Sequence, residues 1–297
     1  MQCRFGDLAV DSAIPLAGLP AADGPADIRI VDRPLPGASW AALHEWSSDE
    51  GEQWLAIEMG APGYRLTFPE LTCVVSHDGT EITVDAAALP ADAPLTHLLL
   101  HQILPLAVSR GGRMVLHACA VETPHGAIGL LGPSGAGKST LTAAFCRRGA
   151  ALVADDALLI DMRGGAATAW PTADGIRLWD DMREVIPGSA PHASVEAPRK
   201  RRIAARIAAS AMPLVRLFVV GDTAVAGARV RVMTPAETRL SVLSHLFRID
   251  IADPGESRRL FDLAHAFAAA VPARHLAYPD GIAHLDGAVD AVLQDVA

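Results

Sequence analysis

The sequence has few cysteines, no long apolar run and no excess of positive charge. Its four cysteines, Cys3, Cys73, Cys119 and Cys146, show no short metal-binding spacing, which favours a reduced, cytoplasmic protein over a disulfide-stabilised one. No apolar stretch is long enough to cross a bilayer, and the first residues lack the apolar segment of a signal peptide. The formal net charge of −9 argues against general nucleic-acid binding. We therefore expect a cytoplasmic protein without membrane or nucleic-acid partners.

The first 90 residues differ in composition from the rest of this 297-residue chain, which is long enough for one large or two modest domains. They are rich in proline and glycine. Short alternating or β-branched segments lie at residues 27–31, 54–58, 64–68, 72–76 and 81–85. Such segments are typical of strands, and residues 77–80 have the composition of a hairpin turn. We predict a small antiparallel sheet without catalytic residues, which packs on a second domain or holds a partner.

Residues 91–297 alternate between helical and strand patterns. Residues 95–110 have helical periodicity, which Pro105 should kink or divide. Residues 114–121 and 127–131 are predicted to be neighbouring strands on either side of a turn. This pairing places His117 near the second strand, either as a hydrogen-bonded core residue or as part of a site. Other strands are expected at residues 150–154 with a continuation at 157–161, and at 175–179, 214–220 and 228–233, and helices at 180–185, from 234 onward, at 256–270 and at 287–294.

A glycine-rich stretch, Gly-Pro-Ser-Gly-Ala-Gly-Lys-Ser at residues 132–139, fits the pattern G-x-x-x-x-G-K-[ST] without a mismatch. Its glycines let the backbone aim several N–H groups into one concavity that suits phosphate, and a helix N-terminus after it favours anions. A strand before it and a helix at residues 139–148 after it complete the order of a nucleotide-binding βαβ unit. The expected nucleotide-binding residues here are Gly132, Pro133, Ser134, Gly135, Ala136, Gly137, Lys138, Ser139 and Thr140.

An acid pair, Asp155-Asp156, follows the next apolar run. In a nucleotide site Lys138 would contact the outer phosphates and the Ser139 hydroxyl would bind Mg²⁺. With two carboxylates, one can hold the metal while the other accepts a proton from an attacking hydroxyl. Simple NTPases also have acids here, so the pair alone leaves transfer and hydrolysis open. The guanine motif Asn-Lys-x-Asp is absent, which makes ATP the expected nucleotide.

A cluster of positive charge closes a polar, proline-containing stretch. Residues 187–198 are a candidate mobile loop, and Arg199-Lys200-Arg201-Arg202 follows it. Lys200, Arg201 and Arg202 are either a solvated face or a phosphate clamp, because arginine can grip phosphate with two hydrogen bonds.

Several of these short segments together resemble one protein family. His117-Ala118, the loop ending Gly137-Lys138-Ser139, Arg148-Gly149 and Ala154-Asp155-Asp156 look like the catalytic core of bacterial HPr kinase/phosphorylase. They resemble still more the HPr-kinase-related proteins of biosynthetic clusters, including the kinases that modify lasso peptides. The resemblance covers about residues 94–200. It implies ATP- and Mg²⁺-dependent transfer to a serine hydroxyl of a peptide or small protein.

The resemblance also implies roles for single residues. Asp156 matches the proton acceptor, Lys138 and His117 match other catalytic positions, and Ser139 matches a magnesium ligand. With Asp156 as the acceptor, Asp155 is the carboxylate of the pair that we expect to hold the metal. A second family signature, a glutamate followed by isoleucine, arginine and a glycine-rich run, is altered here. The corresponding stretch at residues 174–179 begins with an acid displaced by one position and lacks the glycines. This departure points away from a second metal ligand in this stretch, from HPr itself as substrate and from the reverse phosphorylase reaction.

The sequence therefore predicts an α/β protein with a small β-rich domain at residues 1–90 and a catalytic domain at residues 91–297. The catalytic domain is expected to be a P-loop kinase core of the phosphoenolpyruvate-carboxykinase-like type. The leading function is a serine kinase acting on a peptide, plausibly a biosynthetic precursor of the lasso type. The alternatives are a nucleotide-binding regulatory ATPase or sensor without phosphotransfer, and a kinase of a small metabolite. The oligomeric state stays open, a homo-oligomer included.

Overall fold

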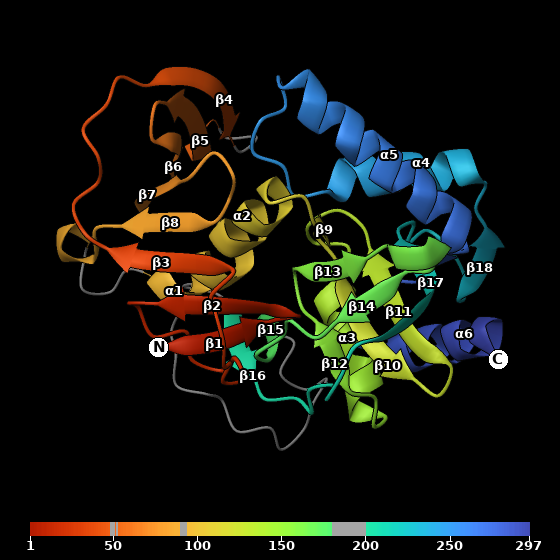
Figure 1. The fold of residues 1–297 in the computed structure, drawn as a ribbon. Coiled ribbons are helices and arrows are strands. Elements are labelled where there is room, and N and C mark those ends of the chain that lie inside the picture. Colours follow the sequence, from red (N-terminus) through yellow and green to blue (C-terminus); the bar gives the residue numbers. More distant parts are fainter. Residues whose placement is uncertain (48–50, 52, 90–93, 180–199) are drawn as a thin grey trace. The chain divides into compact units, whose positions relative to one another are not determined.

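The computed structural model describes residues 1–47, 51, 53–89, 94–179 and 200–297, apart from the side chains of residues 179, 200 and 201. Within this part the chain forms two compact units (Figure 1). Unit 1 comprises residues 1–113 and 247–259, and unit 2 comprises residues 114–246 and 260–297. This division differs from the boundary expected at residue 90, because residues 95–110 and a short late segment pack with the N-terminal sheet.

Unit 1 contains one eight-stranded sheet. Its strands are β1 (Gln2–Phe5), β2 (Leu8–Ser12), β3 (Ile28–Asp32), β4 (Ala41–Ser47), β5 (Gln53–Gly60), β6 (Gly63–Thr67), β7 (Thr72–Val75) and β8 (Glu81–Val84). Their order in the sheet is β1-β2-β3-β8-β7-β6-β5-β4. The five predicted strands correspond to β3 and β5 to β8, whereas β1, β2 and β4 were not predicted.

The expectation of a wholly antiparallel sheet is wrong for three of these strands. β2 pairs with β3 in parallel, and β3 pairs with β8 in parallel. Hairpin signals report only the pairing of strands that are consecutive in the sequence, as between β5, β6, β7 and β8. The β3–β8 pair joins segments that are distant in the sequence, and turn composition contains no information about it.

The helical segment of unit 1 is divided, as Pro105 led us to expect. It consists of α1 (Leu95–Leu98), a π-helical turn η2 (Leu99–Ile103) and α2 (Leu104–Arg110). Pro105 lies in the first turn of α2, directly after the π-helical turn, and it has no backbone N–H group for a helical hydrogen bond. A 3₁₀ turn, η1 (Ala86–Ala88), precedes this segment. α2 packs on β8 and buries its apolar side chains there.

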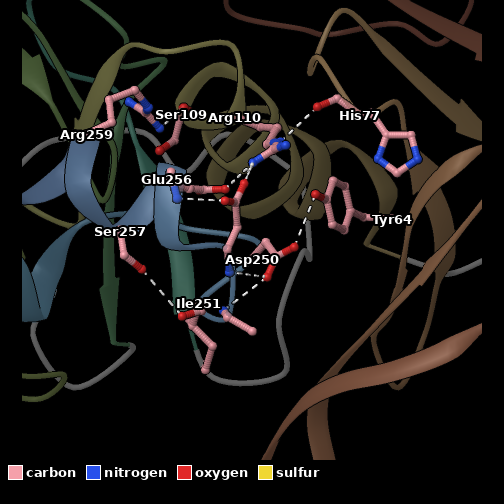
Figure 2. Close-up of polar contacts among 12 residues, drawn as sticks. Tyr64, His77, Ser109, Arg110, Asp250, Ile251, Glu256, Ser257 and Arg259 are labelled. Atoms are coloured by element: carbon pink, nitrogen blue, oxygen red, sulfur yellow. Dashed lines mark hydrogen bonds and ion pairs between the residues drawn. The ribbon is translucent and has the colours of Figure 1, made fainter.

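The late segment, residues 247–259, is held to unit 1 by polar contacts (Figure 2). The Arg110 guanidinium forms ion pairs with Glu256 and with Asp253, the latter at 3.3 Å. The Tyr64 hydroxyl donates to Asp250 Oδ2 at 3.3 Å. Helix α5 (Pro254–Ala270) begins within this segment and continues into the residues of unit 2.

Unit 2 contains a nine-stranded mixed sheet. Its strands are β9 (Met114–Leu116), β10 (Cys119–Thr123), β11 (Gly126–Leu131), β12 (Leu152–Ala154), β13 (Leu158–Asp161), β14 (Thr168–Trp170), β17 (Met212–Val220), β18 (Arg229–Val232) and β19 (Ala273–Ala277). The order is β12-β10-β11-β17-β14-β13-β9, and β19 pairs with both β17 and β18. β11, β17 and β19 are parallel, and the other pairs are antiparallel. β15 (Ile176–Trp179) and β16 (Lys200–Ile203) form a separate antiparallel pair.

Helices cover both faces of this sheet. The helices are α3 (Lys138–Arg147), α4 (Pro235–His245), α5 and α6 (Leu285–Val296), with 3₁₀ turns η3 (Arg163–Gly165) and η5 (Ile282–His284). Ile128 and Leu130 of β11 share a buried cluster with α3 and α6, whereas Ala127 and Leu131 share another with α4 and α5. Since alternate strand residues face opposite sides, this separation defines two covered faces and confirms the α/β class.

Predictions for the later elements were mixed. The Thr234 cap of α4 is confirmed, because its hydroxyl accepts from the Glu237 N–H group at 3.2 Å in a capping box. The expectation that residues 157–161 continue the strand at 150–154 is wrong. β12 ends at Ala154, and β13 pairs with β9 and β14 instead of β10. The predicted helix at 180–185 and loop at 187–198 lie outside the described residues.

None of the helices in the described ranges combines the length and the apolar character that crossing a bilayer demands.

Candidate functional site

The glycine loop, residues 132–139, joins the end of β11 to the start of α3. Gly132, Gly135 and Gly137 have φ angles of +150°, +82° and +82°, which residues other than glycine rarely adopt. A Cβ atom on Gly132 would lie 2.6 Å from the Val220 carbonyl oxygen at the end of β17. The loop therefore passes close to the backbone of the neighbouring parallel strand. Its tip, residues 133–135, is exposed, and Ala136, Gly137, Ser139 and Thr140 are half-buried.

The Lys138 side chain folds back over this loop. Its ammonium group donates to the carbonyl oxygens of Gly132 at 2.8 Å and of Pro133 at 3.0 Å. The residue is only 6% exposed. These contacts place a positive charge at the glycine loop, where it favours an anion.

Strand pairing brings three segments together at one edge of the sheet. In the register of β10, Cys119 lies opposite Leu130 of β11, and Ala120 lies opposite Ala154 of β12. β10 is antiparallel to both partners, so its first residue lies where β11 and β12 end. The glycine loop follows β11 and the acid pair follows β12. Consequently the loop, the acid pair and Cys119 meet at this edge.

Asp155 is the centre of the hydrogen bonds at this edge. Its Oδ1 accepts from the Ser139 hydroxyl at 3.1 Å and from the Cys119 thiol at 3.3 Å. Its Oδ2 accepts from the Arg177 backbone N–H group at 2.8 Å. The residue is 2% exposed. Burial, and then the neighbouring charge of Asp156, raise the pKa of Asp155, while Arg177 opposes the increase.

This donor set fits a divalent cation. A hydroxyl oxygen and a carboxylate oxygen are the ligand types that Mg²⁺ takes from proteins, with phosphate and water completing the shell. Ligand atoms of Cys119, Asp155 and Asp156 all lie within 4.8 Å of one another. The predicted metal-binding residues Ser139 and Asp155 are thus brought into direct contact.

Asp156 and His117 lie beside Asp155. Asp156 is half-buried and has a φ of +70°, a conformation that is uncommon outside glycine and that is often found at functional sites. His117, between β9 and β10, donates its backbone N–H group to the His245 carbonyl oxygen at 2.7 Å. Burial lowers the pKa of His117, the Asp156 charge raises it and Lys138 lowers it. Of the four predicted catalytic residues, His117 is therefore coupled electrostatically to Asp156 and Lys138, and Asp155 is coupled to Asp156.

The predicted phosphate clamp is only partly described. The side chains of Lys200 and Arg201 lie outside the described part of the structure. The Arg202 guanidinium forms an ion pair with Asp174 at 2.8 Å, and the Arg202 side chain is 14% exposed. A solvated face is therefore wrong for Arg202, because its charge is neutralised by a largely buried carboxylate.

Two residues of the site were not predicted. Cys119 contacts both Asp155 and Ser139, although its neighbours along the chain are apolar and suggested a core residue. Its position two residues after the candidate residue His117 was the available signal. Arg177 anchors Asp155 through its backbone and lies 3.9 Å from Asp174 through its side chain. It lies within residues 174–179, at the start of β15.

Comparisons with known proteins found a weak structural similarity. No protein-family model matches the chain, and no curated protein matches its sequence. Among solved structures, the chain is similar to the Hpr(Ser) kinase/phosphatase from Coxiella burnetii. The identity is 12% and the TM-score is 0.32, over 61% of this chain and 95% of that one. A similarity of this size carries no conclusion about activity, which has to be argued from the residues of the site.

Proposed function

We propose that the protein is an ATP- and Mg²⁺-dependent kinase that transfers the γ-phosphoryl group to a serine hydroxyl of a peptide or small protein. The observation that carries the proposal is the arrangement of Ser139 and Asp155, 3.1 Å apart at the glycine loop, beside a second carboxylate on Asp156. One carboxylate in contact with the metal-binding hydroxyl and a second one next to it supply both a metal ligand and a base.

Each residue has a defined task in this proposal. The loop N–H groups and Lys138 bind the phosphates, and Ser139 with Asp155 would hold Mg²⁺, which neutralises phosphate charge when bound. Asp156 takes the proton of the acceptor serine while the serine oxygen bonds to the γ-phosphorus. The bond from that phosphorus to the β–γ bridging oxygen breaks, and ADP leaves. His117 beside Asp156 is proposed to orient this carboxylate.

The serine acceptor rests on the family resemblance of the motifs, and the base is what separates a kinase from a nucleotide sensor. A sensor has no requirement for a second carboxylate next to the metal ligand, whereas phosphoryl transfer to a hydroxyl needs a group that accepts its proton. The substitution Asp156→Asn keeps the shape of the side chain and removes the proton acceptor. It therefore tests the feature on which the two functions differ.

We expect Asp156→Asn to lower phosphoryl transfer by about 10²–10⁴-fold, the usual contribution of a general base, with ATP affinity retained. The assay uses labelled ATP with peptides encoded near the gene, and ATP affinity is measured by calorimetry. Asp161→Asn, a change of the same kind at the end of β13, serves as control and should have wild-type activity. Equal transfer by the Asp156→Asn variant and the wild type would contradict the proposal. Phosphorylation of a small hydroxylated metabolite alone would instead support a metabolite kinase.

A further inference from the structure

We infer that Cys119 is a third protein ligand of the cation site, which therefore binds thiophilic divalent cations more tightly than a site made of oxygen ligands alone. The inference rests on the proposed function for the position of the cation between Ser139 and Asp155. The inference adds a soft sulfur ligand, from Cys119, to the oxygen ligands that would be sufficient for Mg²⁺. It also names the class of cation that the site selects, namely cobalt, zinc and cadmium ions.

The distances in the site suit one ion. Cys119 Sγ lies 3.3 Å from Asp155 Oδ1 and 3.8 Å from Ser139 Oγ, and Asp156 completes a group whose ligand atoms lie within 4.8 Å of one another. With metal–sulfur bonds of about 2.3 Å and metal–oxygen bonds of about 2.0–2.2 Å, a tetrahedral site places sulfur and oxygen about 3.6 Å apart. The observed separations lie on both sides of that value.

The surroundings hold these ligand atoms in place. Cys119 has no exposed surface, and Asp155 is 2% exposed. The backbone of Cys119 is fixed in the β10–β11 ladder opposite Leu130, and Arg177 holds the far oxygen of Asp155. Oδ1 of Asp155 accepts hydrogen bonds from both the Cys119 thiol and the Ser139 hydroxyl. A cation at this oxygen therefore meets sulfur and hydroxyl ligands that already point at the same atom.

A buried cysteine is more often a small apolar core residue than a ligand. Cys119 differs from that pattern because its sulfur faces a carboxylate and a hydroxyl. On cation binding the S–H bond breaks, a sulfur–metal bond forms and the proton passes to solvent. The thiolate and the Asp155 carboxylate then contact a doubly charged ion, and the Asp156 carboxylate lies next to them. Thiolate ligands select zinc-like and other soft cations, whereas carboxylate and hydroxyl ligands suit Mg²⁺ and Mn²⁺.

The test is a Co²⁺ titration of the full-length protein without nucleotide or peptide. We expect a sulfur-to-cobalt charge-transfer absorption in the near ultraviolet that saturates at one equivalent. Cys119→Ser should abolish this absorption and weaken Co²⁺ binding by more than the roughly tenfold effect of losing an outer-shell partner. Cys146→Ser, which alters a half-buried cysteine of α3 in the same unit, should leave absorption and affinity unchanged.

A second variant keeps the test decisive if Cys119→Ser does not fold. Asp156→Asn retains the thiol, so it should keep the absorption while weakening Co²⁺ binding. Absence of the absorption in the wild type, or its persistence in a folded Cys119→Ser variant, would overturn the inference. Because no ATP is present, this outcome is independent of kinase activity. Phosphoryl transfer without a cobalt–sulfur absorption would refute only the proposal that Cys119 is a ligand. A cobalt–sulfur absorption without phosphoryl transfer would refute only the proposed kinase function.

Discussion

At the scale of single residues, Gly132 is required for two separate reasons. Its φ of +150° disfavours a side chain, and a Cβ atom there would lie 2.6 Å from the Val220 carbonyl oxygen. Gly135 also has a positive φ, of +82°, but a Cβ atom on it would meet nothing within 4 Å. A side chain at Gly135 would therefore cost only the unfavourable backbone conformation, whereas one at Gly132 would also collide with β17.

We expect Gly135→Ala to lower the free energy of unfolding by about 1–3 kcal/mol, the usual cost of such a conformation outside glycine. Gly132→Ala should lower the free energy of unfolding further, because the loop backbone or the Val220 carbonyl group has to move to make room for the new Cβ atom. It should also weaken ATP binding, since the loop shifts away from the end of β17. Urea unfolding of both variants checks the difference. Equal losses would show that the contact with Val220 does not constrain the loop.

The residues that could be predicted from the sequence are those that a local motif places. Lys138 and Ser139 occupy fixed positions after the glycines, and Asp155 follows the next apolar run. Cys119 and Arg177 reach the site only through the pairing of β10 with its neighbours and through the bend at residues 155–156. Strand register between distant segments is set by packing of the whole unit, and no single stretch of the sequence contains it.

At the scale of elements, the β15–β16 pair is attached to the site through Asp174. Its carboxylate lies 2.8 Å from the Arg202 guanidinium and 3.9 Å from that of Arg177, with Asp174 2% exposed. Arg177 in turn donates its backbone N–H group to Asp155. One buried acid thus joins both strands of the pair and supports the residue that positions Asp155.

We expect Asp174→Ala to lower the free energy of unfolding by about 3–5 kcal/mol, because two largely buried guanidinium groups lose their shared carboxylate. The control is Glu81→Ala, whose pair with Arg33 has side chains 37% and 58% exposed and should contribute about 0–1 kcal/mol. Chemical denaturation measures both values. A loss for Asp174→Ala no larger than that of the control would mean that the buried pair does not stabilise this element.

Predictions of elements succeeded where the signal is local. The cap at Thr234 identified the start of α4, and Pro105 identified the start of α2. The expectation that residues 157–161 continue the preceding strand failed for a local reason. The apolar run resumes after the acid pair, but the positive φ of Asp156 turns the chain, so that β13 pairs with β9 and β14. An aspartate is compatible with either conformation, so the pattern of residues could not indicate the bend.

At the scale of the whole molecule, the chain passes three times between the residues of unit 1 and those of unit 2. Residues 247–259 belong to unit 1 although the rest of that unit ends at Arg113, which explains why composition along the chain did not reveal the division. Within unit 1 this segment depends on Arg110, whose side chain is 19% exposed and is paired with Glu256, 1% exposed (Figure 2).

We expect Arg110→Met to lower the free energy of unfolding by about 3–5 kcal/mol, because it leaves the Glu256 carboxylate buried without its cation. Detachment of residues 247–259 should then become more frequent, so limited proteolysis should cut this segment sooner than in the wild type. The matched control is Arg113→Met, which removes a half-buried pair with Asp7 at 2.9 Å that does not involve the segment. If both variants are cleaved within residues 247–259 at the same rate, Arg110 does not hold the segment in place.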